Sequence, residues 1–159
     1  AVFARMADDM PEVPQYVFGL YRRPRGLGNA HYSRHPILKT IRSYYGRSKV
    51  WICASASEGF GLPILEAMAC GCAVVSTDCG GPGEIIRDGV NGFLVPVGDV
   101  EAIVDRTTTL LADEELRDRI IAEGYRTANA YSWPRAGDTF ERCIMEAVKR
   151  SGRTATSGK

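Results

Sequence analysis

Apolar residues in the first two-thirds of the chain fall into short runs, which predict β-strands. The runs lie at residues 16–21, 50–54, 73–77 and 93–95 and are rich in Val, Ile, Phe and Tyr. Because the run at residues 50–54 is apolar throughout, we expect both faces of the sheet to be covered.

Apolar residues between and after these runs recur at helical spacing, which predicts amphipathic helices. The predicted helices cover residues 2–10, 37–46, 63–71, 84–88, 100–111, 114–129 and 132–150. Asp99 is placed to cap the fifth helix. The spacing predicts that Phe140, Ile144 and Val148 face inward from the last one. Residues 22–36 show no clear helix or strand, so we expect a loop there.

This alternation of strands and helices predicts an α/β fold. The expected architecture is a Rossmann-like, three-layer α/β/α arrangement with a mostly parallel sheet. Such sheets bind ligands at the carboxyl ends of their strands, where loops lead into helix N-termini. The loops at residues 55–62 and 78–83 fit this position, so we expect a functional site there.

Composition and charge narrow the classes of function. The 159 residues, 45% of them hydrophobic, are expected to form one globular domain, residues 1–150, with a disordered polar tail at 151–159. The formal net charge of +1 argues against binding to nucleic acid. No apolar run approaches the roughly 20 residues that a transmembrane helix needs.

The first residues and the cysteines indicate the cellular setting. The chain opens on Ala1 without a signal peptide, so we expect a piece cut from a longer, cytoplasmic protein. The five cysteines are expected to be reduced and buried, with Cys143 on the inner face of its helix.

The residues that most often bind metals are poorly placed for it here. Cys70 and Cys72 form a C-x-C pair with no His nearby in the sequence, and His31 and His35 lie in a segment with loop chemistry. We therefore expect no metal site.

Three arginines and two tryptophans allow more than one interpretation. Arg22, Arg23 and Arg25 follow a predicted strand, where they would be either a solvated loop or contacts to phosphate. Trp51 and Trp133 are expected to pack in the core rather than to form platforms for sugars.

A glycine-rich loop between residues 54 and 63 carries the candidate chemistry. Gly59 and Gly61 flank Phe60 and allow the backbone to approach a ligand closely. Pro63 suits the first turn of the helix that follows. The N–H groups at such a helix start attract phosphate, so the loop is typical of a phosphate-binding site.

Two carboxylates flank this helix start. Glu58 lies in the loop and Glu66 about one turn into the helix, where each can accept hydrogen bonds from sugar hydroxyls. Either one, taken singly, is also an ordinary acid that complements the helix dipole. A phosphate-binding loop between two hydroxyl acceptors is what a nucleotide sugar requires.

The same residues resemble the E-x7-E signature of retaining GT-B glycosyltransferases of the group 1 (family 4) type. Glu58 and Glu66 correspond to its acids, with Gly-Phe-Gly-Leu-Pro at residues 59–63. The resemblance continues through the helix segment Glu-Ala-Met-Ala-Cys-Gly at 66–71 and through residues 73–81, 84–86, 88–96, 98–99 and 131–133. It covers about residues 37–148, with order and spacing intact.

This resemblance implies the C-terminal half of a GT-B fold, the domain that binds a UDP- or GDP-sugar. The enzyme would transfer the sugar with retention of anomeric configuration, in polysaccharide, glycolipid or cell-wall assembly. The acceptor, a saccharide or a lipid-linked molecule, would be held by an N-terminal domain that this chain lacks. The full-length protein would be cytoplasmic, or peripheral at the inner membrane.

The resemblance also assigns roles to residues of the loop and helix. Glu66 would bind the ribose hydroxyls. Glu58, the candidate catalytic residue, would contact hydroxyls of the donor sugar rather than act as a simple general base. The backbone of Gly59, Phe60, Gly61 and Leu62 would meet the sugar and the diphosphate. Neither a metal nor a cofactor is implied, since helix dipoles and basic side chains neutralise the leaving group.

Two departures from the family pattern affect these expectations. The first strand of the domain, with the Gly-Arg and Lys that bind the diphosphate, would precede Ala1. The segment at residues 22–36 is short and lacks a clear helix and strand. We therefore expect the fragment alone to be inactive.

Two other functions are compatible with parts of the pattern. A non-catalytic module that binds a nucleotide or a sugar is the main alternative. A nicotinamide-dependent dehydrogenase is disfavoured, because no G-x-G-x-x-G follows a strand. Gly80, Gly81 and Gly83 either allow approach to the nucleotide sugar or serve only the backbone conformation.

Overall fold

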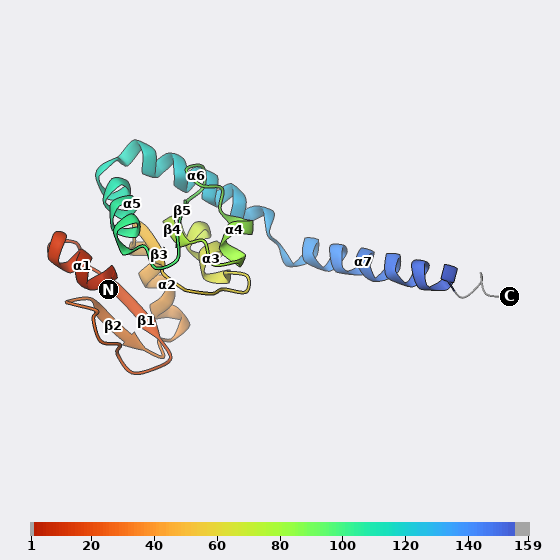
Figure 1. The fold of residues 1–159 in the computed structure, drawn as a ribbon, viewed down its shortest axis with the longest axis horizontal. Helices are drawn as coiled ribbons and strands as arrows, with labels where there is room; N and C mark the ends of the chain where they lie inside the picture. Colours follow the sequence, from red (N-terminus) through yellow and green to blue (C-terminus); the bar gives the residue numbers. More distant parts are fainter. Residues whose placement is uncertain (1, 155–159) are drawn as a thin grey trace. The chain divides into compact units, whose positions relative to one another are not determined.

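The computed structural model describes residues 2–154, and the chain divides into two compact units (Figure 1). The first unit is Ala1–Ala128 and the second is Asn129–Lys159. The strands are β1 (Tyr16–Gly19), β2 (His31–Arg34), β3 (Val50–Cys53), β4 (Ala73–Thr77) and β5 (Phe93–Val95). The helices are α1 (Val2–Asp9), α2 (Leu38–Arg47), α3 (Leu62–Ala69), α4 (Gly81–Ile85), α5 (Val100–Ala112), α6 (Glu114–Ala130) and α7 (Trp133–Thr154).

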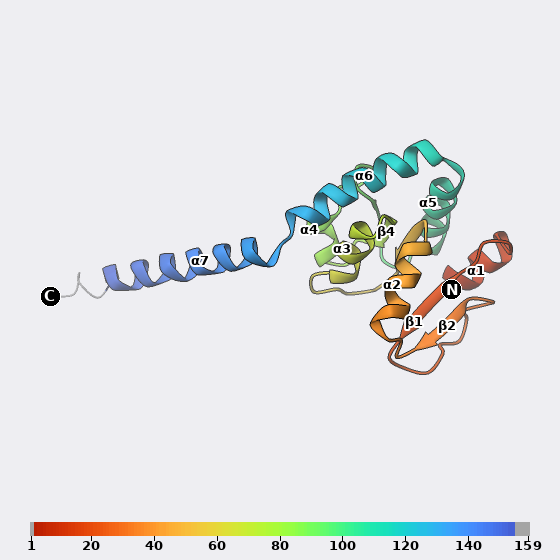
Figure 2. The same ribbon diagram turned by 180° about the vertical axis from the view of Figure 1, so that it is seen from behind.

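A parallel sheet with the order β3-β4-β5 forms the centre of the first unit. Val50 lies opposite Ala73 on the neighbouring strand, and Val75 lies opposite Phe93. All five residues of β4 are buried, because helices cover both faces of the sheet. The two opposite views in Figures 1 and 2 show this layering, and the predicted α/β/α arrangement is confirmed.

Two hydrophobic clusters lie on the two faces of this sheet. Ala73 and Val75 of β4 belong to a cluster with residues of α1, α5 and α6. Val74, which points the other way, belongs to a cluster with residues of α2, α3 and α4. Fully buried side chains such as Leu110 and Met68 anchor the two clusters. Burial of one such side chain contributes about 1.5–3 kcal/mol to the stability of the fold. The clusters on the two faces therefore hold the helices against the sheet.

A second, two-stranded parallel sheet consists of β1 and β2. Tyr16 lies opposite His31, and Gly19 lies opposite Arg34. We expected only a loop at residues 22–36, and β2 shows that this was wrong. Its sequence His-Tyr-Ser-Arg has no apolar run, because the strand is held by its ladder to β1 rather than by burial of its own side chains.

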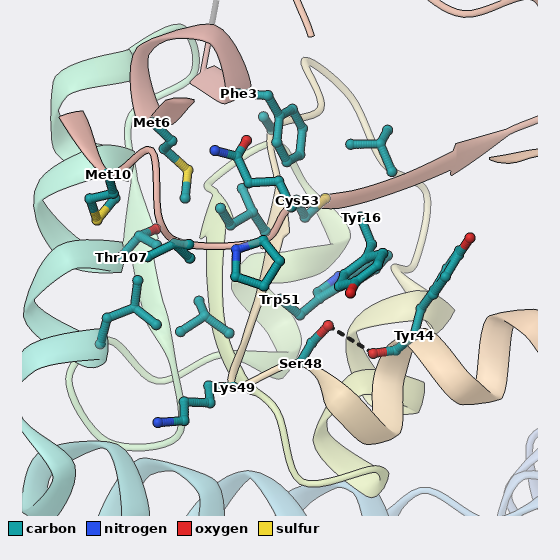
Figure 3. A pocket seen from close by; sticks show the side chains of 18 of the residues that line it. Phe3, Met6, Met10, Tyr16, Tyr44, Ser48, Lys49, Trp51, Cys53 and Thr107 are labelled. Atoms are coloured by element: carbon teal, nitrogen blue, oxygen red, sulfur yellow. Dashed lines mark hydrogen bonds between the residues drawn. The ribbon is translucent and has the colours of Figure 1, made fainter. Parts of the chain in front are cut away.

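A groove of about 860 Å³ separates the two sheets of the first unit. Its walls include the strands β1 and β3. Phe3 and Met6 of α1, and Met10 directly after that helix, line it as well (Figure 3). Among the described residues, β1 pairs only with β2 and β3 pairs only with β4, so one edge of each strand is unpaired. The indole N–H of Trp51 is buried without a partner in the described part of the chain.

Most predicted boundaries in the first unit agree with the structure to within a few residues. The cap on α5 is confirmed, since the Asp99 carboxylate accepts a hydrogen bond of 2.9 Å from the Ala102 amide. The predicted strand at residues 16–21 ends instead at Gly19, and the next two side chains are exposed. Helix α4 begins at Gly81, three residues earlier than predicted, because Pro82 fits its first turn.

The second unit contains α7, whose side chains are exposed from Trp133 to Ser151. Phe140, Ile144 and Val148 were expected to face inward, and Trp133 was expected in the core, but all four are exposed. The spacing of this stripe is helical, yet the described part of the unit holds no other complete helix or strand to cover it. Helix α7 extends to Thr154, into the segment expected to be a disordered tail, and residues 155–159 lie outside the described residues.

The five cysteines are free thiols, but only one of them is fully buried, and Cys53 and Cys79 are half-buried. Cys72 is buried, and burial raises the pKa of its thiol to about 12. Cys70 and Cys143 are exposed, so the expectation of burial was wrong for both. Cys70 lies at the carboxyl end of α3, and Cys143 shares the exposure of α7.

No helix in the described part of the chain combines the length and the apolar character needed to cross a bilayer.

Candidate functional site

The two loops that the sequence singles out lie side by side at the carboxyl ends of β3 and β4. Backbone hydrogen bonds join them directly: the Glu58 amide donates to the Cys79 carbonyl oxygen over 3.2 Å, and the Gly81 amide donates to the Glu58 carbonyl oxygen over 3.1 Å. The two loops therefore form one continuous backbone surface above adjacent strands, as expected for a parallel sheet.

Glycines make this close approach possible. A β-carbon added to Gly81 would lie 2.6 Å from three backbone atoms of Phe60, so the space beside Gly81 is taken by the other loop. Gly80 has a φ of 112°, and Gly61, which precedes α3, has a φ of 91°; both values are rare for residues with a side chain. For Gly81, the structure thus identifies a packing constraint.

Glu58 is half-buried, and its carboxylate is held in place. The Ser55 hydroxyl donates to Glu58 Oε1 over 2.7 Å. Ser55 is itself fixed, because its carbonyl oxygen accepts a hydrogen bond of 2.6 Å from the Thr77 hydroxyl at the end of β4. Glu58 is therefore anchored both through its side chain and through its backbone.

Glu66 lies on α3 and is exposed to solvent. The hydroxyl of Tyr45, on α2, donates to Glu66 Oε2 over 3.1 Å. Burial, and secondly the negative charge of Glu66, raise the pKa of the Tyr45 phenol. The phenol consequently stays protonated and acts as a hydrogen-bond donor to the carboxylate.

Three of the remaining residues of the predicted site lie on the surface between these acids, whereas Gly61 is buried. Phe60 and Leu62 are exposed, and Gly59 has open space around its α-carbon. Pro63 occupies the first turn of α3, as predicted. The structure thus places Glu58, the loop and Glu66 around the start of one helix.

Sequence reasoning missed Tyr45, Ser55 and Thr77. Tyr45 is 21 residues away from Glu66, and only the packing of α2 beside α3 brings the two together. Ser55 directly follows the predicted strand at residues 50–54 and precedes Glu58 by three residues, so its position was the one available signal. Trp51 was correctly expected to pack, since its ring lies 4.9 Å from that of Tyr45.

The arginines at residues 22–25 are exposed, and one of them has a structural role. The Arg23 guanidinium donates to the carbonyl oxygens of Ala30 and Gly28, each over 2.8 Å, and so closes the loop between β1 and β2. Within the described residues, no three His, Cys, Asp or Glu side chains gather in a way that could hold a metal ion.

Comparison with known protein families decides what kind of domain this is. A family model described as "Glycosyl transferases group 1" matches residues 28–127, which is more than half of the chain. The chain belongs to this family. The matched region of this glycosyltransferase chain contains β2 to β5, both loops and both acids.

Relatives and solved structures agree with this assignment. The chain is 38% identical over 95 residues to a phosphatidyl-myo-inositol mannosyltransferase of Mycobacterium leprae, covering 60% of the chain and 25% of the relative. It is 37% identical over 127 residues to a D-inositol 3-phosphate glycosyltransferase of Geodermatophilus obscurus, covering 78% of the chain and 28% of the relative. The chain thus spans less than a third of these curated relatives.

A solved structure of similar extent supports the fold. The C-terminal domain of a group 1 glycosyltransferase (LpcC) from Francisella tularensis superposes with a TM-score of 0.70 at 32% identity. The match covers 81% of this chain and 74% of that domain. This glycosyltransferase chain therefore has the fold of a GT-B C-terminal domain, as predicted.

Proposed function

We propose that this chain binds a nucleoside-diphosphate sugar around the start of α3, as the donor-binding domain of a retaining glycosyltransferase. The observation that carries the proposal is the pair of carboxylates at this helix start, each held by one hydroxyl group: Glu58 by Ser55 and Glu66 by Tyr45. Membership in the group 1 family supports sugar transfer as the reaction.

The roles of the two acids follow from their surroundings. Glu66 is exposed and reads the ribose hydroxyls, because an ionised carboxylate only accepts hydrogen bonds and a diol supplies two donors. Glu58 is half-buried beside the glycine-rich backbone and contacts the transferred sugar. The backbone of residues 59–62 meets the diphosphate, whose charge the helix dipole of α3 favours.

We further propose that the nucleotide is UDP or GDP and that no metal or cofactor takes part. The acceptor, a saccharide or a lipid-linked molecule, is bound outside this chain, so the chain alone does not catalyse transfer. The groove between β1 and β3 supports the expectation of an additional strand, because one edge of each of these two strands is unpaired among the described residues.

Replacing Glu66 with alanine is expected to weaken the binding of UDP or GDP by about 10- to 100-fold, because hydrogen bonds to a charged group are worth about 1.5–3 kcal/mol. Isothermal titration calorimetry on the wild-type chain and the variant measures this change. Glu115→Ala, which removes an exposed acid from the first turn of α6, is the matched control and should bind normally. Equal affinities for wild type and Glu66→Ala would remove the ribose assignment.

Replacing Glu58 with alanine is expected to weaken the binding of the nucleotide sugar by about tenfold more than the binding of the bare nucleotide. The difference arises because the bare nucleotide lacks the hydroxyls that Glu58 contacts. A thermal-shift screen of nucleotide sugars first identifies the preferred ligand, since bound ligand raises the unfolding temperature. Calorimetry then compares the ligand pair, and an equal loss for both would contradict the sugar contact.

A further inference from the structure

The hydrogen bond between Tyr45 and Glu66 joins a buried residue to an exposed one. Tyr45 is 4% exposed, and its ring packs against the rings of Trp51 and Phe18 at centroid distances of 4.9 and 6.3 Å. The buried Cys72 thiol donates to the Tyr45 carbonyl oxygen over 3.2 Å. The packing of the Tyr45 ring and the hydrogen bond to its backbone carbonyl therefore hold the phenol oxygen in place.

Glu66 has no comparable packing of its own. Its side chain is exposed, and a glutamate that is held in one conformation loses about 1.5–2 kcal/mol of rotamer entropy. The Tyr45 hydroxyl lies 3.1 Å from Glu66 Oε2 and 3.5 Å from the Pro63 carbonyl oxygen, so it sits directly beneath the first turn of α3. The hydrogen bond from Tyr45 therefore orders the Glu66 carboxylate before a ligand binds.

The hydrogen bond also leaves most of the carboxylate available. A carboxylate offers about four acceptor positions, and the phenol occupies one of them on Oε2. Because the pKa of Tyr45 is raised, its hydroxyl keeps the proton that it donates in this hydrogen bond. Oε1 and the remaining position on Oε2 can then accept from two hydroxyls on neighbouring carbons, which is the spacing of a ribose diol.

We propose that Tyr45 is a positioning residue that orients Glu66 toward both ribose hydroxyls and thereby makes the site select ribonucleotides over 2′-deoxyribonucleotides. This inference rests on the proposed function, because it assumes that Glu66 binds the ribose. Tyr45 itself touches no ligand. It holds the Glu66 carboxylate in one orientation, in which the carboxylate accepts hydrogen bonds from both ribose hydroxyls.

The test compares UDP with 2′-deoxy-UDP, or GDP with 2′-deoxy-GDP, by calorimetry on the wild-type chain and on Tyr45→Phe. The wild type is expected to prefer the ribonucleotide by about tenfold or more. Tyr45→Phe keeps the ring and its packing but removes the hydroxyl. Ribonucleotide affinity should fall about fivefold to tenfold, while that of the 2′-deoxy ligand changes less than twofold, so the preference largely disappears.

Tyr44 provides a matched control on the same helix. It is buried as well, and its hydroxyl shares a hydrogen bond of 2.5 Å with the Ser33 hydroxyl instead of a site residue. Tyr44→Phe should therefore leave the preference for ribose unchanged. If Tyr45→Phe proves poorly folded by circular dichroism, Tyr45→Met, which also lacks the hydroxyl but fills part of the same space, replaces it in the same comparison.

The possible outcomes separate this inference from the function on which it rests. A wild-type chain that binds neither nucleotides nor nucleotide sugars would overturn the proposed function and the inference with it. Binding of ribonucleotide and 2′-deoxyribonucleotide with equal affinity by the wild type would overturn the inference and the contact of Glu66 with both ribose hydroxyls, while nucleotide-sugar binding itself would stand. Equal weakening of both ligands in Tyr45→Phe would overturn the inference alone, because it would mark Tyr45 as merely structural.

Discussion

Replacing Gly81 with alanine is expected to destabilise the first unit by about 3 kcal/mol and to abolish tight binding of a nucleotide sugar. The new methyl group would lie 2.6 Å from the backbone of Phe60, and backbone atoms cannot move aside as the end of a flexible side chain can. The loops must separate, which lengthens the hydrogen bond from the Gly81 amide to the Glu58 carbonyl oxygen. Glu58 then leaves its position beside α3.

Urea unfolding and calorimetry together measure the two effects of Gly81→Ala. Gly46→Ala is the matched control, because a β-carbon there meets nothing within 4 Å and the residue lies in α2. That control should be neutral or stabilising by about 0.5–1 kcal/mol, as alanine is the better helix former. A Gly81→Ala chain with the stability and ligand affinity of the wild type would show that the loops adjust freely.

Replacing Asn91 with alanine is expected to lower the free energy of unfolding by about 3 kcal/mol. Asn91 is 1% exposed, and its side-chain amide donates to the Ile85 carbonyl oxygen over 3.0 Å and to the Thr127 hydroxyl over 2.8 Å. Its side-chain oxygen accepts a hydrogen bond of 2.7 Å from the Arg87 amide. Alanine leaves these buried groups without their partner and disconnects α6 from the end of α4.

Thermal unfolding measures this effect as a decrease of about 6–12 °C in the midpoint. Asn91→Asp provides a graded comparison, because it keeps the acceptor for Arg87 but loses the donors to Ile85 and Thr127. The exposed Asn29, replaced by alanine, should change the midpoint by only about 1 °C. A midpoint for Asn91→Ala that matches the Asn29→Ala control would rule out this account of the buried network.

The sequence predicted the elements whose burial pattern is local. β3 and β4 are short apolar runs, and α5 carries both a helical stripe and a capping Asp99. β2 could not be predicted in this way, because its hydrogen bonds to β1 come from residues 15 positions away and leave no trace in its own apolar pattern. The inward face assigned to α7 failed for the opposite reason: its stripe is clear, but burial requires a second element.

The candidate site could be predicted only as far as it is continuous in the chain. Glu58, the glycine-rich loop and Glu66 lie within nine residues, so their arrangement around one helix start follows from local structure. The groups that hold them come from other elements: Tyr45 from α2 and Thr77 from the end of β4. Such contacts depend on the packing of helices and strands, which no spacing within the sequence reveals.

The backbone hydrogen bonds between the two loops determine which substitutions this site can accept during evolution. The hydrogen bonds that connect residues 58, 79 and 81 involve only backbone atoms, so they form with any residue at position 79 and with any residue except proline at position 58. Mutation at these two half-buried loop positions can alter the chemistry presented to a ligand while the backbone framework persists. Gly81 is the exception, because the packing of the two loops leaves no room for a side chain at this position. Evolutionary freedom in this region is therefore broad in chemistry and narrow at Gly81 and at Gly80, whose φ of 112° is rare for residues with a side chain.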